Sequence, residues 1–273
     1  MIAEIGKNFI DSTRKKTWSE NLVDAERLVH HAKLAGATIA KFQCHVFADE
    51  QSKRHPSRWN WLKINEDGTP IEFWKELRAF CDWQQIEMLV TPMSMLAARR
   101  VNNLVQRWKV GSADIVDMEL LEYLKSTGKP IIVSTGMSTN EQISEALDFL
   151  GDQVQCVLYC VSVYPCPVYK IDFRKMLMLT SQENPMEKYI PFGFSDHSLS
   201  IEVPALAVRM GAKVIEKHFT LDRNAFGPDH KVSLLPAEFK QMVDLCKKAE
   251  TEGESFEEEK GHWEKFRSNI KSI

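Results

Sequence analysis

The chain carries the sequence GFSDHS at residues 193–198 and the sequence EKHFT at residues 216–220, and these two stretches decide its interpretation. Each stretch places a histidine, His197 or His218, at the end of an apolar run that is typical of a buried strand. Residues 201–210, between them, have the periodicity of a helix and precede Gly211. The order strand, helix, strand predicts two parallel strands, whose C-terminal ends share one edge. We therefore expect His197 and His218 to lie close together.

The same alternation of strand and helix patterns runs through all 273 residues. Eight runs rich in apolar and β-branched residues are predicted to be buried parallel strands: Ile2–Gly6, Thr38–Gln43, Glu87–Thr91, Trp108–Ser112, Pro130–Ser134, Gln155–Val161, Ile190–Ser195 and Lys213–Phe219. Helical periodicity is found in Ser19–Leu34, Phe73–Trp83, Met93–Leu104, Glu119–Ser126, Asn140–Leu150 and Glu202–Met210.

Eight such repeats in about 250 residues are typical of a (β/α)8 barrel, the TIM barrel. We predict an α/β fold with one TIM-barrel domain over residues 1–250, followed by a C-terminal tail or truncated linker over residues 251–273. A doubly wound open sheet is the alternative fold, but no GxGxxG turn follows the first predicted strand.

Composition and charge exclude several classes of protein. The net charge is −3, which gives no electrostatic basis for binding nucleic acid or an anionic membrane. No stretch approaches the roughly 18 consecutive apolar residues of a membrane span. The chain begins directly with a strand pattern, and its six cysteines form no CxxC pair. We therefore expect no signal peptide and a cytoplasmic protein whose thiols are reduced and mostly buried.

Two segments do not fit the repeating pattern. Gln51–Gly68 is polar and aromatic and contains Pro56, so it is predicted to be a long loop over the mouth of the barrel. Gly261–Ile273 mixes aromatic and basic residues, and is interpreted either as a helix that closes the bottom of the barrel or as the start of a linker.

In a barrel of this kind, the residues that carry the chemistry lie at the C-terminal ends of the strands. Every predicted strand exit here is polar, and the side chains include Glu4, Lys41, Gln43, Thr91, Lys109, Ser112, Ser134, Tyr164, Ser195 and Glu216. Lys41 and Lys109 follow apolar residues inside strands, where an unpaired charge is costly. Each lysine could extend its charged end to the surface. Together with the serines, however, they are typical of a cradle for a phosphate or carboxylate group.

The two histidines are candidate metal ligands, because neutral imidazole is the commonest protein ligand of transition metals. A single histidine is more often a residue of the core or the surface, but two at matched strand ends favour a metal site. Asp229 lies in the sequence GPDH at residues 227–230, after the last predicted strand. It is either part of a simple turn or an acceptor for substrate hydroxyl groups.

These motifs together resemble the N-acetylneuraminate (sialic acid) synthase family. The resemblance is carried by AEIG (3–6), KFQ (41–43), KVGS (109–112), STGMS (134–138), YP (164–165), GFSDH (193–197), EKHFT (216–220) and GPDH (227–230). It extends from residue 3 to about residue 236, in the order of the family.

The resemblance implies a barrel that condenses phosphoenolpyruvate with the open aldehyde form of an N-acetylated amino sugar, such as N-acetylmannosamine. Phosphate is released and a nine-carbon 2-keto sugar acid is formed. The family's divalent ion, Mn or Mg, maps to His197 and His218. The phosphoenolpyruvate contacts map to Lys41, Thr91, Lys109, Ser112, Ser134 and Ser195, and the sugar contacts to Glu4, Gln43, Tyr164 and Asp229. Lys41 and Lys109 hold the anion, while Glu4 or Glu216 stabilises positive charge and assists water attack.

The chain also departs from the family pattern. Phe9 stands where the family usually has histidine, and Ser162 where it often has asparagine. Family members usually continue into a small antifreeze-like domain, which in a homodimer supplies an arginine to the partner's sugar. We expect weak sugar binding without that domain, or a lid formed by Gln51–Gly68 with Arg54 or Arg58 as the cation. The alternative functions are another metal-dependent aldolase or lyase that uses a pyruvate-type substrate, and a non-catalytic barrel that binds a sugar phosphate.

Overall fold

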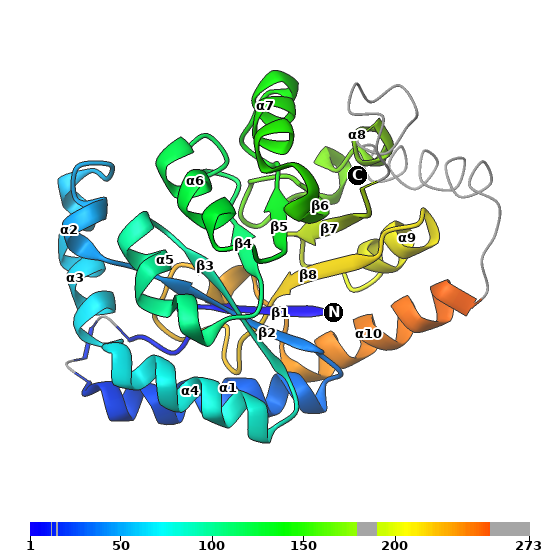
Figure 1. Ribbon diagram of the computed structural model, residues 1–273. Coiled ribbons are helices and arrows are strands. Elements are labelled where there is room, and N and C mark those ends of the chain that lie inside the picture. Colours follow the sequence, from blue (N-terminus) through cyan, green and yellow to red (C-terminus); the bar gives the residue numbers. More distant parts are fainter. Residues whose placement is uncertain (12, 15, 179–189, 252–273) are drawn as a thin grey trace.

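A computed structural model describes the chain except residues 12, 15, 179–189 and 252–273. Eight parallel strands pair in sequence order and close into one barrel, with helices on its outside (Figure 1). The strands are β1 (Ile2–Gly6), β2 (Ile39–Cys44), β3 (Glu87–Pro92), β4 (Trp108–Val110), β5 (Ile131–Ser134), β6 (Val154–Cys160), β7 (Phe192–Asp196) and β8 (Val214–His218). The predicted TIM barrel is confirmed, and each predicted strand boundary lies within about two residues of the observed one.

The α-helices are α1 (Trp18–Leu34), α2 (Phe47–Glu50), α3 (Trp59–Asp67), α4 (Ile71–Trp83), α5 (Met95–Val101), α6 (Met118–Ser126), α7 (Asn140–Leu150), α8 (Phe173–Met178), α9 (Val203–Arg209) and α10 (Pro236–Thr251). Short 3-10 turns are η1 (Pro56–Arg58), η2 (Asn102–Leu104), η3 (Gly151–Gln153), η4 (Val168–Lys170) and η5 (His230–Val232). Side-chain caps fix several helix starts. Thr17 with Glu20 and Thr139 with Gln142 form complete capping boxes at α1 and α7.

Alternation along the strands divides the interior of the barrel into an apolar and a polar layer. Ile2, Leu89, Ile132, Cys156 and Leu158 form a separate buried cluster inside the barrel. Two residues further along four of these strands lie the side chains of Glu4, Thr91, Ser134 and Cys160. Successive inward-facing side chains are two residues apart in a strand, so the mouth of the barrel is polar and its lower part is packed.

Gly193, in the GFSDHS sequence, allows β7 to lie close to its neighbours. A Cβ atom at this position would lie 2.3 Å from the carbonyl oxygen of Val214 and 2.6 Å from Cδ2 of Leu158. No larger residue fits there without moving backbone. This close approach brings Ser195 into register with Glu216 of β8.

The expectation that Gln51–Gly68 is a loop is wrong for most of the segment, which contains η1 and the nine-residue helix α3. Leu62 and Asn65 are buried on one face of α3, and tertiary contacts hold the helix in place. Glu66 accepts a hydrogen bond from the backbone N–H of Phe47 and pairs with Arg100 of α5 at 2.8 Å. The helix α10, which the sequence did not predict, packs against α9 and α1.

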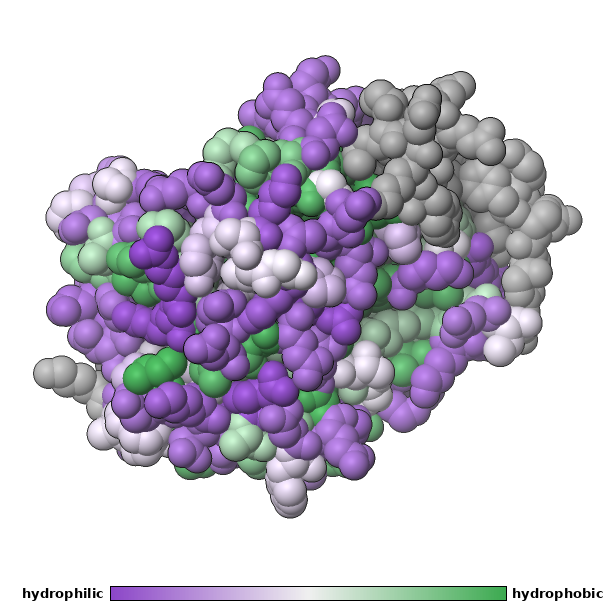
Figure 2. Space-filling view, in the orientation of Figure 1, coloured by the Kyte–Doolittle hydropathy of each residue, from purple (hydrophilic) through white to green (hydrophobic). Residues whose placement is uncertain are grey.

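All six cysteines are free and buried, as predicted. No helix in the described part of the chain is long and apolar enough to cross a membrane. The face of the molecule in Figure 2 is mostly hydrophilic, with hydrophobic residues in small separate groups. The interpretations of Gly261–Ile273 fall outside the described residues.

Candidate active site

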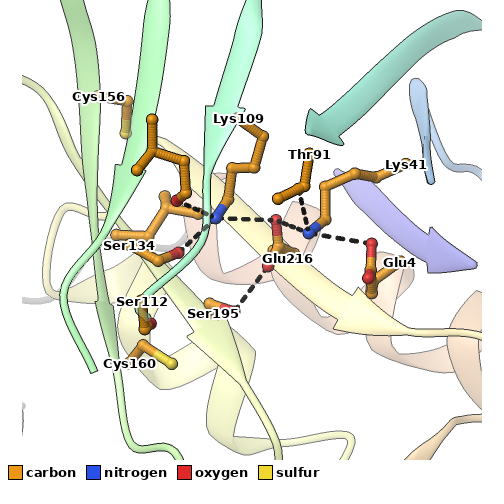
Figure 3. A network of polar contacts seen from close by, with 12 residues as sticks. Glu4, Lys41, Thr91, Lys109, Ser112, Ser134, Cys156, Cys160, Ser195 and Glu216 are labelled. Atoms are coloured by element: carbon orange, nitrogen blue, oxygen red, sulfur yellow. Dashed lines mark hydrogen bonds and ion pairs between the residues drawn. The ribbon is translucent and has the colours of Figure 1, made fainter. Parts of the chain in front are cut away.

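Two lysines and two glutamates form a buried ionic network in the mouth of the barrel (Figure 3). Nζ of Lys41 lies 3.0 Å from Oε2 of Glu4 and 3.4 Å from Oε2 of Glu216. Nζ of Lys109 lies 3.9 Å from the same oxygen of Glu216. All four side chains are at most 6% exposed, so neither lysine extends to the surface. Carboxylates from β1 and β8 offset the cost of burying the lysines of β2 and β4.

The protonation states of this network differ from those of isolated groups. Burial alone would raise the pKa of Glu216, but Lys109 and Lys41 outweigh burial and lower that pKa to about 2. Burial would lower the pKa of Lys41, but Glu216 and Glu4 outweigh it and raise the pKa. At Lys109 burial dominates and lowers the pKa. Glu216 is therefore an anion at neutral pH and a weak base, suited to stabilising positive charge.

Hydroxyl groups lie beside both lysines. Lys41 donates a hydrogen bond of 3.3 Å to Oγ1 of Thr91. Lys109 donates to Oγ of Ser134 at 2.6 Å and to the backbone carbonyl of Val110 at 3.0 Å. An anion placed between the lysines would therefore meet two ammonium groups and two hydroxyl donors, the set that phosphate and carboxylate binding requires.

Two further predicted contact residues complete this wall of the mouth. Ser195 donates a hydrogen bond of 2.8 Å to Oε1 of Glu216. Ser112 accepts a 3.0 Å hydrogen bond from the backbone N–H of Gly136, which ties the exit of β4 to that of β5. The structure thus brings together Lys41, Thr91, Lys109, Ser112, Ser134, Ser195 and Glu216 in one region (Figure 3).

The expected proximity of the two histidines is confirmed, with ring centroids 5.3 Å apart. Nδ1 of His197 lies 2.9 Å from the carbonyl oxygen of Val161, to which it can only donate, so Nε2 carries the lone pair when the ring is neutral. Nδ1 of His218 is buried without a hydrogen-bond partner. Burial lowers the pKa of His218 to about 3, which keeps its imidazole neutral. At His197 burial would lower the pKa, but the contacts with Cys160 and the Val161 carbonyl outweigh burial and raise it. Burial therefore holds only His218 in the neutral form, with the His197 ring close beside it.

Three of the four predicted sugar-binding residues gather around Gly6. A Cβ on Gly6 would lie 3.1 Å from Oε1 of Glu4, 3.3 Å from Nε2 of Gln43 and 3.4 Å from Oδ2 of Asp229. Gln43 also donates a 2.9 Å hydrogen bond to Glu4. Tyr164 packs on the ring of His197, with centroids 4.1 Å apart, and its side chain is half exposed. Tyr164, the fourth of these residues, thus lies against the histidine pair.

Two polar residues of the mouth were not singled out from the sequence. Asp114 is buried, and its Oδ2 has no hydrogen-bond partner. Burial raises the pKa of Asp114 to about 6. Cys160, expected to be a core thiol, has its Sγ 3.7 Å from Nδ1 of His197. In the sequence, only their positions near strand exits indicate these two residues: Asp114 follows Ser112 by two residues, and Cys160 ends β6.

Phe9, which departs from the family pattern, lies outside the mouth. Its ring stacks on Phe73 at 5.2 Å and contacts Phe42 edge-on at 6.0 Å. Phe42 alternates with the inward-facing Lys41 and Gln43, so this cluster belongs to the layer between barrel and helices. Phe9 therefore affects the packing between the barrel and its helices and does not line the mouth.

The model of one protein family, described as the NeuB family, matches residues 28–257. The chain belongs to the NeuB family. It is 33% identical over 247 residues to an N,N'-diacetyllegionaminic acid synthase of Legionella pneumophila, covering 83% of this chain and 68% of the relative. It is 30% identical over 257 residues to the N-acetylneuraminate-9-phosphate synthase of Homo sapiens, covering 89% and 68%.

An uncharacterized protein of Methanocaldococcus jannaschii, MJ1065, is 38% identical over 225 residues, covering 80% of this chain and 64% of that relative. The chain thus spans about two thirds of the length of these curated relatives. Among solved structures, it is similar to an N-acetylneuraminic acid synthetase from Leptospira borgpetersenii crystallised with citrate. That comparison gives a TM-score of 0.79 at 27% identity and covers 92% of this chain and 83% of the other.

A second similar structure is the spore coat polysaccharide biosynthesis protein SpsE from Bacillus subtilis. It has a TM-score of 0.77 at 32% identity, and the match covers 92% of this chain and 68% of that one. Members of this family thus share the barrel that the sequence of this chain predicted.

Proposed function

We propose that this chain condenses phosphoenolpyruvate with an N-acetylated amino sugar, of the N-acetylmannosamine type or a related precursor of a nonulosonic acid. Phosphate is released and a nine-carbon 2-keto sugar acid is formed. One observation carries the proposal: Lys41 and Lys109 flank Glu216 in a buried network beside His197 and His218. Relatives named as synthases of legionaminic acid and N-acetylneuraminate 9-phosphate support it.

In this proposal the lysines hold the anionic substrate. Lys41 and Lys109 face the phosphate and carboxylate of phosphoenolpyruvate, and Thr91, Ser112 and Ser134 supply neutral donors. Each lysine is already restrained by a hydroxyl group, so little side-chain freedom is lost on binding. The donors then orient the enol carbon toward the sugar aldehyde, which lies on the side of Gln43, Tyr164 and Asp229.

His197 and His218 fit a divalent ion, Mn²⁺ or Mg²⁺, because burial keeps His218 neutral and the Val161 carbonyl orients His197, whose Nε2 would bind the ion after losing its proton. No group of three or more His, Cys, Asp or Glu side chains in the described part of the chain is arranged to hold a metal. Water or substrate oxygen would therefore complete the coordination. A bound ion would polarise the aldehyde oxygen of the sugar.

The glutamates have separate roles in the proposed reaction. Addition of the enol carbon to the aldehyde leaves positive charge on the carbon that bears the phosphate ester. Glu216 stays ionised because of the two lysines, and it stabilises this charge. Glu4, 3.0 Å from Lys41 and bonded to Gln43, is the carboxylate assigned to orient the attacking water.

The test is a phosphate-release screen with phosphoenolpyruvate, Mn²⁺ or Mg²⁺, and a panel of N-acetylated hexosamines and their 6-phosphates. We expect release that depends on one sugar of the panel and on the metal. Lys109→Met serves as the matched inactive control, because it removes one ammonium group and retains most of the side-chain volume. Condensation with pyruvate in place of phosphoenolpyruvate, without phosphate release, would instead indicate an aldolase. Binding of sugar phosphate without turnover would indicate a non-catalytic barrel.

A further inference from the structure

The mouth of the barrel has too little positive charge for a substrate with several negative charges. The charges of Lys41 and Lys109 are offset by those of Glu4 and Glu216. Phosphoenolpyruvate adds a carboxylate and a phosphate to this neutral group. Burying that charge is costly unless further cations face it. A bound divalent ion supplies part of that charge, and a further cationic side chain near the mouth would supply more.

Arg54 is a cation with unused hydrogen-bond donors at this mouth. It lies between α2 and η1, on the segment that follows β2. Its Nε lies 3.9 Å from Oε2 of Glu50, and its Nη2 lies 3.9 Å from Oδ1 of Asp114. Both distances are too long for hydrogen bonds. Among the residues that the structure describes, the Arg54 side chain donates no hydrogen bond, and it is 29% exposed.

The neighbours of Arg54 place it on the side of the mouth that holds the anion-binding residues. A Cβ on Gly111 would lie 2.7 Å from Oδ2 of Asp114 and 3.6 Å from Cγ2 of Thr91. Asp114 therefore lies against the strand exits that carry Thr91 and Ser112, and Arg54 lies directly beyond it. Arg58 differs, since its charge acts on Asp229, at the sugar side of the mouth.

We propose that Arg54 is an anion-binding residue of the active site and contacts the carboxylate or phosphate of bound phosphoenolpyruvate. This inference rests on the proposed function. The planar guanidinium group presents paired N–H donors that match the oxygens of either group. Contact requires the guanidinium group to move away from Glu50 and Asp114 toward the substrate. Hydrogen bonds to the substrate then replace two ion pairs that are 3.9 Å long. The sequence indicates Arg54 as a cation for the sugar, whereas the position of Arg54 beside Asp114 favours the anionic substrate.

The experiment compares phosphoenolpyruvate binding by calorimetry, at constant ionic strength, in the wild-type chain and in Arg54→Ala, Arg54→Lys and Lys53→Ala. Lys53 is the matched control, since it lies on the same segment and pairs with Asp117 at 2.5 Å, next to the same rim. We expect Arg54→Ala to weaken binding by about 10- to 100-fold, the range of a charge-assisted hydrogen bond. The affinity of Arg54→Lys for phosphoenolpyruvate should lie between those of wild type and Arg54→Ala. The affinity of Lys53→Ala should stay within about threefold of wild type.

Steady-state kinetics supply a second readout. Arg54→Ala should raise the KM for phosphoenolpyruvate and leave the KM for the sugar within about twofold. If wild type and Arg54→Ala bind phosphoenolpyruvate equally well, the role of Arg54 is wrong but the proposed function stands. The same holds if Arg54→Ala raises only the KM of the sugar. If the wild-type chain binds no phosphoenolpyruvate at millimolar concentration, the proposed function fails as well. Thermal melts without ligand check folding, and Arg54→Lys provides the comparison if the alanine variant does not fold.

Discussion

Asp196 and Lys217 form a fully buried ion pair directly behind the two histidines of the barrel mouth. Nζ of Lys217 lies 2.5 Å from Oδ2 of Asp196, and the two residues are opposite each other in the pairing of β7 and β8. The same ammonium group donates to the backbone carbonyls of Ser198 and Ser200. Because successive side chains alternate across a strand, the pair holds the strand ends from behind, while His197 and His218 face the mouth.

Breaking this pair should strongly destabilise the protein. Lys217→Met leaves the Asp196 carboxylate buried without its cation, which costs about 3–5 kcal/mol of unfolding free energy. Urea denaturation measures the loss. Lys213→Met, a change of an exposed lysine one strand position before β8, is the control and should shift stability by less than about 0.5 kcal/mol. A double variant, Asp196→Leu with Lys217→Met, should lose less than the sum of the single changes. Additive losses would mean that the two residues do not interact.

Lys7 should make stability depend on pH in the alkaline range. Its Nζ is buried without a hydrogen-bond partner, over the rings of Phe9 and Trp74, and burial lowers its pKa from 10.5 to about 8. Between about pH 8 and 10.5 the unfolded chain binds more protons at this residue, so the free energy of unfolding should rise with pH. Below about pH 8 the charged amine should destabilise the fold by about 3 kcal/mol.

Lys7→Met should therefore raise the unfolding free energy at pH 7 and remove the rise between pH 8 and 10.5. Chemical denaturation at several pH values checks both effects. Lys33→Met, at the last turn of α1, is a control with an ordinary partly exposed lysine. An unfolding free energy that falls equally with pH in wild type and variant would contradict the role assigned to Lys7.

Glu216→Gln should separate substrate binding from turnover. Removing the carboxylate charge frees Lys41 and Lys109 from one competitor, so phosphoenolpyruvate should bind as well as in wild type, or up to about tenfold more tightly. The rate should fall by about 100-fold or more, because the charge that stabilises the reacting carbon is lost. Binding by calorimetry and kcat by phosphate release test the two parts. A weaker affinity with unchanged kcat would assign Glu216 to substrate binding instead.

Removal of either histidine should abolish metal binding. His197→Ala and His218→Ala should each lose the increase in melting temperature that Mn²⁺ gives the wild-type chain, since two ligands cannot be replaced by one. His55→Ala, an exposed histidine next to η1, should retain it. Electron paramagnetic resonance of Mn²⁺ gives a direct count of bound ions. If the wild-type chain and all three variants bind one ion equally well, the metal site lies elsewhere.

Local pattern was enough to predict the barrel, because each strand and helix has its own periodicity and eight repeats allow few arrangements. The order strand, helix, strand likewise predicted that His197 and His218 lie close together. The pattern failed at Gln51–Gly68, where proline and polar residues indicated a loop. There, burial of Leu62 and the contacts of Glu66 with Phe47 and Arg100 stabilise α3.

The charges of the site depended on tertiary structure. The sequence showed lysines at strand exits but could not show that Lys41 and Lys109 share Glu216, because these residues lie on three separate strands. Nor could it show that Arg54 lies near Asp114, since a rim contact depends on how a long segment folds back over the barrel. Periodicity is a property of neighbours in the chain, whereas the pairing of buried charges depends on which strand ends the closed barrel brings together.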